Sequence, residues 1–337
     1  RNTTEDMIFP NIDLTTISGY SKVDANVGTM DNQGWEVGLF TTPYKSGKWK
    51  VDFNFNISSN ENMIREISEY YPNQSGNTDR NGEFKRFLQT DNPFGSFYGY
   101  KFKGVYVDKD ATLARDGNGN VITGPNGQTV YMRFNYPNTD YIFQPGDAIY
   151  EDINKDGNID SRDVVYLGNS NPKLTGGFGP NIIFNNQFKL LLYFNYRLNY
   201  DIVNGTDMLT TNMYGWNNQS TATLSRWRNP GDVTDMPRAV YGAGYNWLGS
   251  DRYVEDASFL RLRSITFSYT LGKSMLKKLK MDEIRTYITA DNLYTWTNYR
   301  GQDPEVSMKS GDPFGIAIDN SRTPPTSRIS LGITTRF

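Results

Sequence analysis

The most constraining feature of this sequence is a set of segments in which apolar and polar residues alternate with a period of two. From Trp49 to Ile57, every odd-numbered residue is apolar and every even-numbered residue is polar. Successive side chains of a β-strand point to opposite faces, so this pattern predicts a strand with one apolar and one polar face. The pattern recurs in Phe188–Asn199, Ile265–Leu271 and Ile329–Phe337, and more weakly in 35–42, 174–184 and 284–293.

The composition agrees with a fold made of strands and turns. Aromatic residues make up 14% of the chain, with 23 Tyr and 19 Phe, and there are 31 Gly. Aromatic residues favour strands, glycines favour turns, and a disordered chain would have few aromatics. No apolar run is long enough for a transmembrane helix. The one candidate helix, Ser274–Met281, is expected to be a solvated turn instead.

The lengths of the connections between the predicted strands distinguish between two possible all-β architectures. Strands with one apolar and one polar face suit a transmembrane antiparallel β-barrel with a wet lumen, and also a soluble β-sandwich, whose loops are mostly short. Here short turns at 42–48, 185–187 and after 271 alternate with long stretches at 58–173, 200–257 and 294–328. Outer-membrane barrels have short periplasmic turns and long extracellular loops. We therefore predict a partial transmembrane barrel with extracellular long loops and a periplasmic C-terminus.

Two predictions concern the long stretches themselves. Segments 97–107 and 141–150 could pair with each other inside the first long stretch. The loop aromatics could stack on sugar rings, but packing of the loops against one another is the favoured interpretation: Tyr214, Trp216, Trp227 and Trp247.

The polar residues of the strands that are expected to face the lumen would serve sugars and peptides alike: Asn54, Asn56, Asn195 and Arg197.

Charge and missing residue types exclude several functions. Lys and Arg total 35 against 37 Asp and Glu, so bulk electrostatics do not predict nucleic-acid binding. The chain has no Cys and no His, which excludes a cysteine nucleophile, a His/Cys zinc site and a Ser-His-Asp triad. Asp303 and Glu305 could suggest glycoside hydrolysis, but such close carboxylates are common in surface turns. We predict that the chain is not an enzyme.

Residues 152–163 match the calcium-binding loop of an EF-hand. Gly157 takes the position at which the turn needs a positive φ, and Ile159 takes the apolar position that anchors the loop. The predicted ligands are Asp152, Asn154, Asp156, Asn158 through its carbonyl, Asp160 and Asp163. Position 12 is an aspartate instead of a glutamate, so we expect Ca²⁺ with Mg²⁺ as the runner-up. The alternative is an Asp- and Asn-rich turn that binds no metal.

Several motifs occur together in a fixed order. They are Gly34-Trp35-Glu36, the 146–172 stretch around the EF-hand-like loop, Asp256–Leu262, Asp291–Trp296, Asp303-Pro304-Glu305, Pro324–Arg328 and the strand that ends at Phe337. In combination they resemble the C-terminal part of a SusC-like TonB-dependent transporter of the Bacteroidetes outer membrane. The resemblance covers essentially the whole chain, and the final aromatic residue resembles the signal for barrel insertion.

The resemblance implies a 22-stranded barrel that holds an N-terminal plug, is gated by TonB and is capped by a SusD-like lipoprotein. Such a pair is integral to the Gram-negative outer membrane and its lipid, and imports oligosaccharides or peptides. Residues 1–337 would then be the C-terminal part of the barrel, completed by the N-terminal plug and barrel portion of the same transporter. The chain begins at Arg1 without a signal peptide, so we expect a mature or cleaved piece. The alternative function is a soluble, calcium-stabilised, β-rich carbohydrate-binding module.

Overall fold

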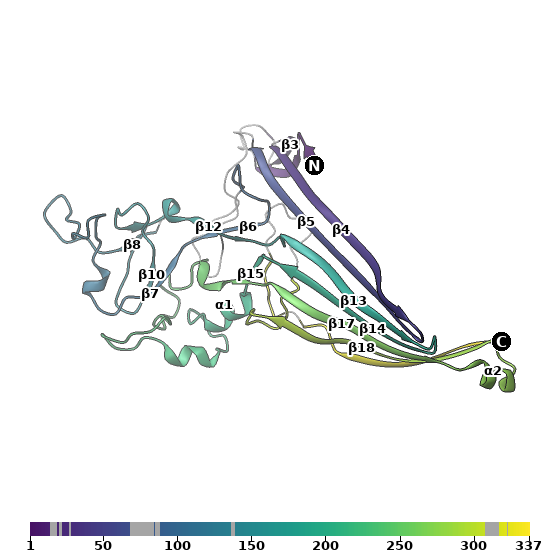
Figure 1. The fold of residues 1–337 in the computed structure, drawn as a ribbon. Helices are drawn as coiled ribbons and strands as arrows, with labels where there is room; N and C mark the ends of the chain where they lie inside the picture. The colour runs from purple at the N-terminus through teal and green to yellow at the C-terminus, as the bar shows by residue number, and fades with distance from the viewer. Residues whose placement is uncertain are drawn as a thin grey trace.

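One antiparallel sheet of eight strands dominates the computed structural model (Figure 1). The structure describes the chain apart from residues 14–18, 20–21, 27, 68–83, 85–87, 136–138, 307–316 and 322. In spatial order the strands are β1 (Asn2–Thr4), β4 (Gly28–Ser46), β5 (Trp49–Ile67), β13 (Leu174–Phe184), β14 (Phe188–Leu198), β17 (Phe259–Thr270), β18 (Glu283–Thr297) and β19 (Arg328–Arg336). From β4 to β19, the strands of this sheet follow their order along the chain, so it is an up-and-down wall. Every strand predicted from the sequence is present, and the all-β, partial-barrel fold is confirmed.

The two faces of the wall differ as the alternation predicts. One row of paired residues across six strands is apolar throughout: Val51, Ile182, Leu190, Phe267, Ile288 and Leu331. The adjacent row is polar except at one position: Asp52, Asn181, Leu191, Thr266, Thr289 and Ser330. Because a shift of one residue moves a side chain to the opposite face, these rows fix the register of the whole sheet.

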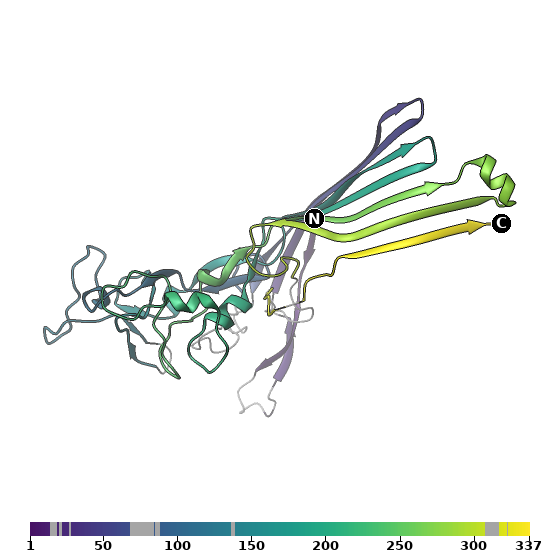
Figure 2. The same ribbon diagram turned by 90° about the horizontal axis from the view of Figure 1, so that it is seen from below.

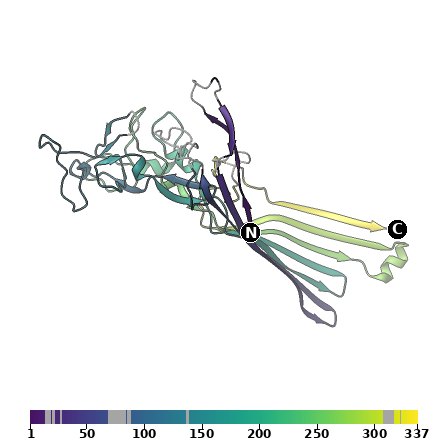
Figure 3. The ribbon, with the colours of Figure 1, turned by 90° about the horizontal axis from the view of Figure 1, so that it is seen from above.

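The short and long connections lie at opposite ends of the strands. The turns from β4 to β5 and from β13 to β14 share one end with the C-terminus, whereas the long stretches gather at the other (Figure 2 and Figure 3). Asn185 and Asn186 both have positive φ in the β13–β14 turn, as a tight hairpin turn requires. The predicted separation of short turns from long loops is confirmed.

Residues 273–279 correct one prediction, because they form helix α2 (Lys273–Leu279) and not a solvated turn. The helix begins after Gly272 and ends at Lys280, whose left-handed backbone lets its N–H donate to the carbonyls of Leu276 and Lys277. Burial of Leu276 gives this short helix a packing contact. Within the described chain, none of the helices has the length and apolar character needed to cross a membrane.

The long stretches fold into a body of small sheets, which we call the loop body. Its paired strands are β6 (Ser96–Gly99) with β12 (Val165–Asn169), β7 (Phe102–Val105) with β10 (Ala148–Tyr150), and β15 (Asp201–Val203) with β16 (Val254–Asp256). β8 (Arg133–Phe134) lies between β9 (Tyr141–Ile142) and β11 (Asn158–Ile159), and α1 (Gly205–Thr211) follows β15. The expected pairing inside the first stretch is thus found between β7 and β10. A separate hairpin joins β2 (Ile8–Asp13) to β3 (Lys22–Asn26).

Buried aromatic and aliphatic side chains hold the loop body together. One cluster surrounds Phe134 and Tyr150, a second surrounds Trp247, and a third joins Phe259 of β17 to Tyr299. Trp227 and Trp247 are buried, so packing, the favoured interpretation, is confirmed for both. Trp216 is 88% exposed and Tyr214 is exposed as well.

Candidate functional site

A cluster of ion pairs lies on the polar face where the strands meet the loop body. Arg261 of β17 is only 2% exposed. Its guanidinium donates to Glu305 at 2.7 Å, to Asp303, and to the Thr295 hydroxyl at 2.9 Å. Arg197 of β14 also reaches Glu305, at 3.3 Å. The 303–305 segment is therefore held against the polar face, and both of its carboxylates are engaged in ion pairs.

A second polar contact lies nearer the short turns. Asp52 is buried and accepts hydrogen bonds from the Thr42 hydroxyl at 2.7 Å, from Lys50 at 3.0 Å and from Asn181 at 3.3 Å. Asn56 accepts from the backbone N–H of Gly177 at 2.8 Å. These contacts place Asp52 and the predicted lumen residue Asn56 among other polar groups, as a wet face requires.

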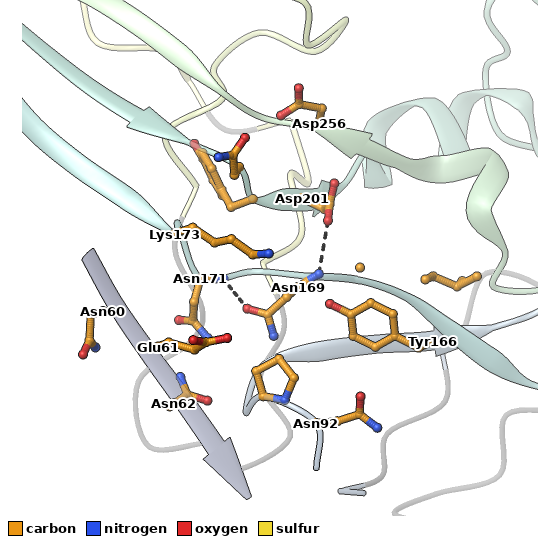
Figure 4. A pocket seen from close by; sticks show the side chains of 15 residues that line it. Asn60, Glu61, Asn62, Asn92, Tyr166, Asn169, Asn171, Lys173, Asp201 and Asp256 are labelled. Atoms are coloured by element: carbon orange, nitrogen blue, oxygen red, sulfur yellow. Dashed lines mark hydrogen bonds between the residues drawn. The ribbon is translucent and has the colours of Figure 1, made fainter. Parts of the chain in front are cut away.

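A cavity of about 560 Å³ opens where β5, the start of β13 and the loop body meet (Figure 4). Six asparagines contribute to its lining: Asn60, Asn62, Asn92, Asn169, Asn171 and Asn199. Four charged residues join them: Glu61, Lys173, Asp201 and Asp256. Amide groups both donate and accept hydrogen bonds, so this pocket suits a polar ligand.

Hydrogen bonds fix part of this lining. Asn169 and Asn171 both donate their side-chain amides to the carbonyl of Phe94, at 3.1 Å and 2.6 Å. The backbone N–H of Asn169 donates to Asp201 at 3.2 Å. Burial raises the pKa of the Asp201 carboxyl, and the negative charge of Asp256 acts in the same direction.

Sequence reasoning missed this pocket because its residues come from segments that lie far apart in the chain. A signal was nevertheless present, since Asn60 and Asn62, like Asn169 and Asn171, are spaced by two residues. That spacing puts the side chains of Asn60 and Asn62 on the same side of β5. Asn171 follows the end of β12, and its backbone N–H donates to the Asn169 side chain at 2.8 Å.

The candidate metal loop, 152–163, adopts the turn that its sequence predicts. Gly157 has φ +84°, and Ile159 is fully buried in the loop-body core. Asp152 accepts hydrogen bonds from the backbone N–H groups of Gly157 at 2.8 Å and Asp156 at 3.3 Å. The Asn154 side-chain oxygen approaches that same N–H of Asp156 at 3.2 Å. Three predicted ligands, Asp152, Asn154 and Asp156, are thus brought together.

The other predicted ligands are partly engaged elsewhere. Asp163 is fully buried and accepts from the backbone N–H groups of Ile153 and Asp160, at 2.8 Å and 2.9 Å. Burial raises the pKa of the Asp163 carboxyl, opposed by those two hydrogen bonds. Arg162 pairs with Asp156 and Asp160, both at 2.6 Å.

The donor set of this loop fits a hard cation because all predicted ligands are oxygens. The side chain of Asn158 donates to Asp156, which leaves its backbone carbonyl as the predicted metal ligand. In the part of the chain that the structure describes, no three acidic, His or Cys side chains converge as a metal-binding group. The positive charge near Asp156 and Asp160 comes from Arg162, so a cation would have to displace that guanidinium.

Known proteins similar to this chain are receptors and transporters. No protein-family model matches it. TonB-dependent receptor P39 of Formosa agariphila is 28% identical over 360 residues, which cover 99% of this chain and 33% of that protein. TonB-dependent receptor P3 of the same organism is 26% identical over 347 residues, covering 99% of this chain and 31% of the relative. TonB-dependent receptor SusC of Bacteroides thetaiotaomicron is 23% identical over 329 residues, covering 94% of this chain and 27% of SusC.

The fold is found in a solved transporter. A structure of the RagAB peptide transporter matches with a TM-score of 0.69 and 22% identity, covering 99% of this chain and 32% of that chain. The chain spans about a third of the length of the first relatives it matches. Its homologues are TonB-dependent receptors, SusC among them, and the resemblance predicted from its motifs is confirmed.

Proposed function

We propose that this chain forms part of the barrel wall and the extracellular loop body of an outer-membrane, TonB-dependent nutrient importer. One observation carries the proposal: two-faced strands separate a set of short turns from a set of long, packed loops. A membrane barrel needs an apolar outer face, a polar lumen and short periplasmic turns. The homologues are TonB-dependent receptors, SusC among them, which supports this assignment.

The apolar face argues for lipid and against the soluble carbohydrate-binding module. On β19, Ile329, Leu331 and Ile333 are 70%, 82% and 71% exposed. Contiguous exposed apolar surface of this kind marks an interaction or membrane-facing surface. In bilayer, these side chains contact acyl chains.

The edges of the sheet require a partner in the membrane. β19 stands at one end of the strand order, and backbone groups in lipid must all be paired. The N-terminal plug and barrel portion of the same transporter would supply the missing strands and the contact with TonB. The loop body would receive a SusD-like lipoprotein, and the substrate would be an oligosaccharide or a peptide.

Single-cysteine spin labels test the membrane assignment, because the chain has no native cysteine. In the complete transporter reconstituted into bilayers, a label at Phe53 should be reached by oxygen from the lipid. A label at the neighbouring Asn54 should be reached by a water-soluble quencher. Equal access of the quencher to both positions would remove the basis of the proposal.

We propose further that the 152–163 loop binds Ca²⁺, or Mg²⁺ as the runner-up, as a structural clamp for the loop body. The supporting observations are the oxygen-only donor set and the convergence of Asp152, Asn154 and Asp156. Asp156→Ala should abolish calcium binding to the complete transporter in titration calorimetry. Asp116→Ala is the matched control, because Asp116 also caps an Asx-type turn, accepting from Asn118 and Asn120. Equal calcium binding by both variants would contradict a site in this loop.

A further inference from the structure

The ion-pair cluster on the polar face holds more positive groups than negative ones. Arg197 of β14 and Arg261 and Arg263 of β17 converge on it from two neighbouring strands (Figure 1). Two carboxylates face them, those of Asp303 and Glu305. Among the residues that the structure describes, no further carboxylate forms an ion pair with these arginines. Three positive charges against two negative ones leave the cluster with a net charge of +1.

The three arginines are not equally well satisfied. Arg261 takes the short contacts, to Asp303 and to the Oε2 atom of Glu305 at 2.7 Å. Arg197 reaches the Oε1 atom of Glu305 only at 3.3 Å, and Arg263 reaches its Oε2 atom only at 3.6 Å. Within the described part of the chain, Glu305 is the one ion-pair partner of either residue. A guanidinium carries five N–H donors, so both arginines have the capacity to bind a further carboxylate.

A β-bulge presents Arg263 to this cluster. Leu262 and Ser264 pair with β14 on one side and with β18 on the other, whereas both registers skip Arg263. A bulge re-aims a side chain, and bulges are common beside functional sites. Arg197 is fixed by its pairing with Phe259. The strands of the wall therefore hold the two arginines that Glu305 satisfies least.

The backbone that carries Glu305 is anchored on both sides of this residue. The hydroxyl of Tyr200 donates to the carbonyl of Pro304 at 2.8 Å. Val306 is buried in the apolar cluster that the end of the wall shares with the loop body. Because these two contacts do not involve the Glu305 carboxylate, its side chain can rotate away from the arginines while the backbone stays in place.

We propose that Arg197 and Arg263 form a site for a carboxylate group of a ligand in the lumen, and that Glu305 occupies this site until the ligand arrives. The inference rests on the proposed importer function, because it requires a ligand that enters the lumen. Guanidinium groups match carboxylates in shape and bind them through charge-assisted hydrogen bonds. The net positive charge of the cluster favours an anion over a neutral ligand. Asp303 stays bonded to Arg261 throughout and keeps the segment on the wall.

Titration calorimetry of the complete transporter with matched ligands tests this site. The acidic ligands are N-acetylated triglutamate amide and trigalacturonate, which separate a peptide source of the carboxylate from a sugar source. Their neutral counterparts are N-acetylated triglutamine amide and the methyl ester of trigalacturonate. At least one acidic ligand should bind, and its neutral counterpart should bind about tenfold more weakly or less, because it loses the charge-assisted hydrogen bonds.

Three substitutions distinguish a ligand site from a purely structural ion pair. Arg197→Gln and Arg263→Gln should each weaken binding of the acidic ligand by about tenfold. Glu305 keeps its bond to Arg261 in both variants, so neither leaves a buried charge unpaired. Glu305→Gln should tighten binding by about tenfold, because it removes the resident carboxylate and leaves the positive charge in place. Glu36→Gln is the matched control and should leave affinity unchanged, since Glu36 lies in the same row of paired residues as Arg197, three strands away.

Four results would overturn the arginine site. They are absence of binding by both acidic ligands, equal binding of an acidic ligand and its neutral counterpart, unchanged affinity in both arginine variants, and a Glu305→Gln variant that binds no more tightly than the unaltered protein. Spin-label accessibility at Phe53 and Asn54 is measured on the same preparations. If the membrane assignment holds while the arginine site fails, the importer function stands and only this ligand chemistry is lost.

Discussion

Replacing Arg261 with alanine should release the segment around Asp303 and Glu305 from the polar face of the barrel. Arg261 is 2% exposed and bonds to both carboxylates. Removing one partner of a buried ion pair costs about 3–5 kcal/mol, because the other charge is left uncompensated. Asp303 and Glu305 keep side-chain exposures of 12% and 24%, and Arg197 still reaches Glu305. The lower end, about 3 kcal/mol, is therefore expected.

A local loss of about 3 kcal/mol raises the open population of the segment by roughly a hundredfold. Hydrogen exchange followed by mass spectrometry would detect it at the amides of Glu305 and Val306, which donate to the Asp303 side chain and the Pro304 carbonyl. Arg263→Ala is the matched control, since Arg263 reaches Glu305 only at 3.6 Å and is 45% exposed in its side chain. Such exposed pairs contribute about 0–1 kcal/mol.

Two results would refute this reasoning. One is equal exchange in Arg261→Ala and Arg263→Ala. The other concerns the variant that combines Arg261→Met with Asp303→Asn and Glu305→Gln, in which no buried charge is left unpaired. If that variant exchanges as fast as Arg261→Ala, the charge imbalance is not the cause.

Three further predictions concern the loops and the wall. Asp201→Asn should stabilise the loop body at neutral pH. Burial raises the pKa of the Asp201 carboxyl in the folded protein. The folded state therefore favours the protonated carboxyl, and stability is lost as the pH rises from the ordinary carboxyl pKa through the raised one. The urea midpoint of loop-body tryptophan fluorescence should then lose part of its pH dependence, and an unchanged profile would refute this. Arg162→Ala should tighten calcium binding by removing a competing cation from Asp156 and Asp160; weaker binding in calorimetry would contradict it. Phe53→Arg should destabilise the inserted barrel by about 2–4 kcal/mol, and Asn54→Arg by much less, as measured by urea unfolding in bilayers; equal costs would oppose the face assignment.

The strands of the wall were predictable because each has one apolar and one polar face. That condition imposes strict alternation on Trp49–Ile57, and the structure pairs the segment with β13 throughout and with β4 on both sides of a register shift between Thr41 and Tyr44. The continuation of β5 to Ile67 was not predicted, because residues 58–62 are all polar and carry no alternation. Pairing with β4 holds that extension in place, and pairing between strands is invisible in a single segment.

The loop body was less predictable because its contacts connect distant segments. Tyr100 packs with Phe134 and Tyr150, and the cavity gathers asparagines from both ends of the first long stretch. The 152–163 turn was the exception, since a glycine at a fixed position and a buried Ile159 are local signals. Helix α2 was missed because its stop signal is Lys280 in a left-handed conformation, a position usually taken by glycine.

Membrane topology tests the central claim most directly. Single cysteines at Asn186, in the tight β13–β14 turn, and at Val233, in the loop body, can be placed in the complete transporter without other thiols in this chain. In intact cells, a membrane-impermeant maleimide should label position 233, and should label position 186 only after the outer membrane is permeabilised. Labelling of position 186 in intact cells, with position 233 protected until permeabilisation, would contradict the proposed orientation and the importer with it.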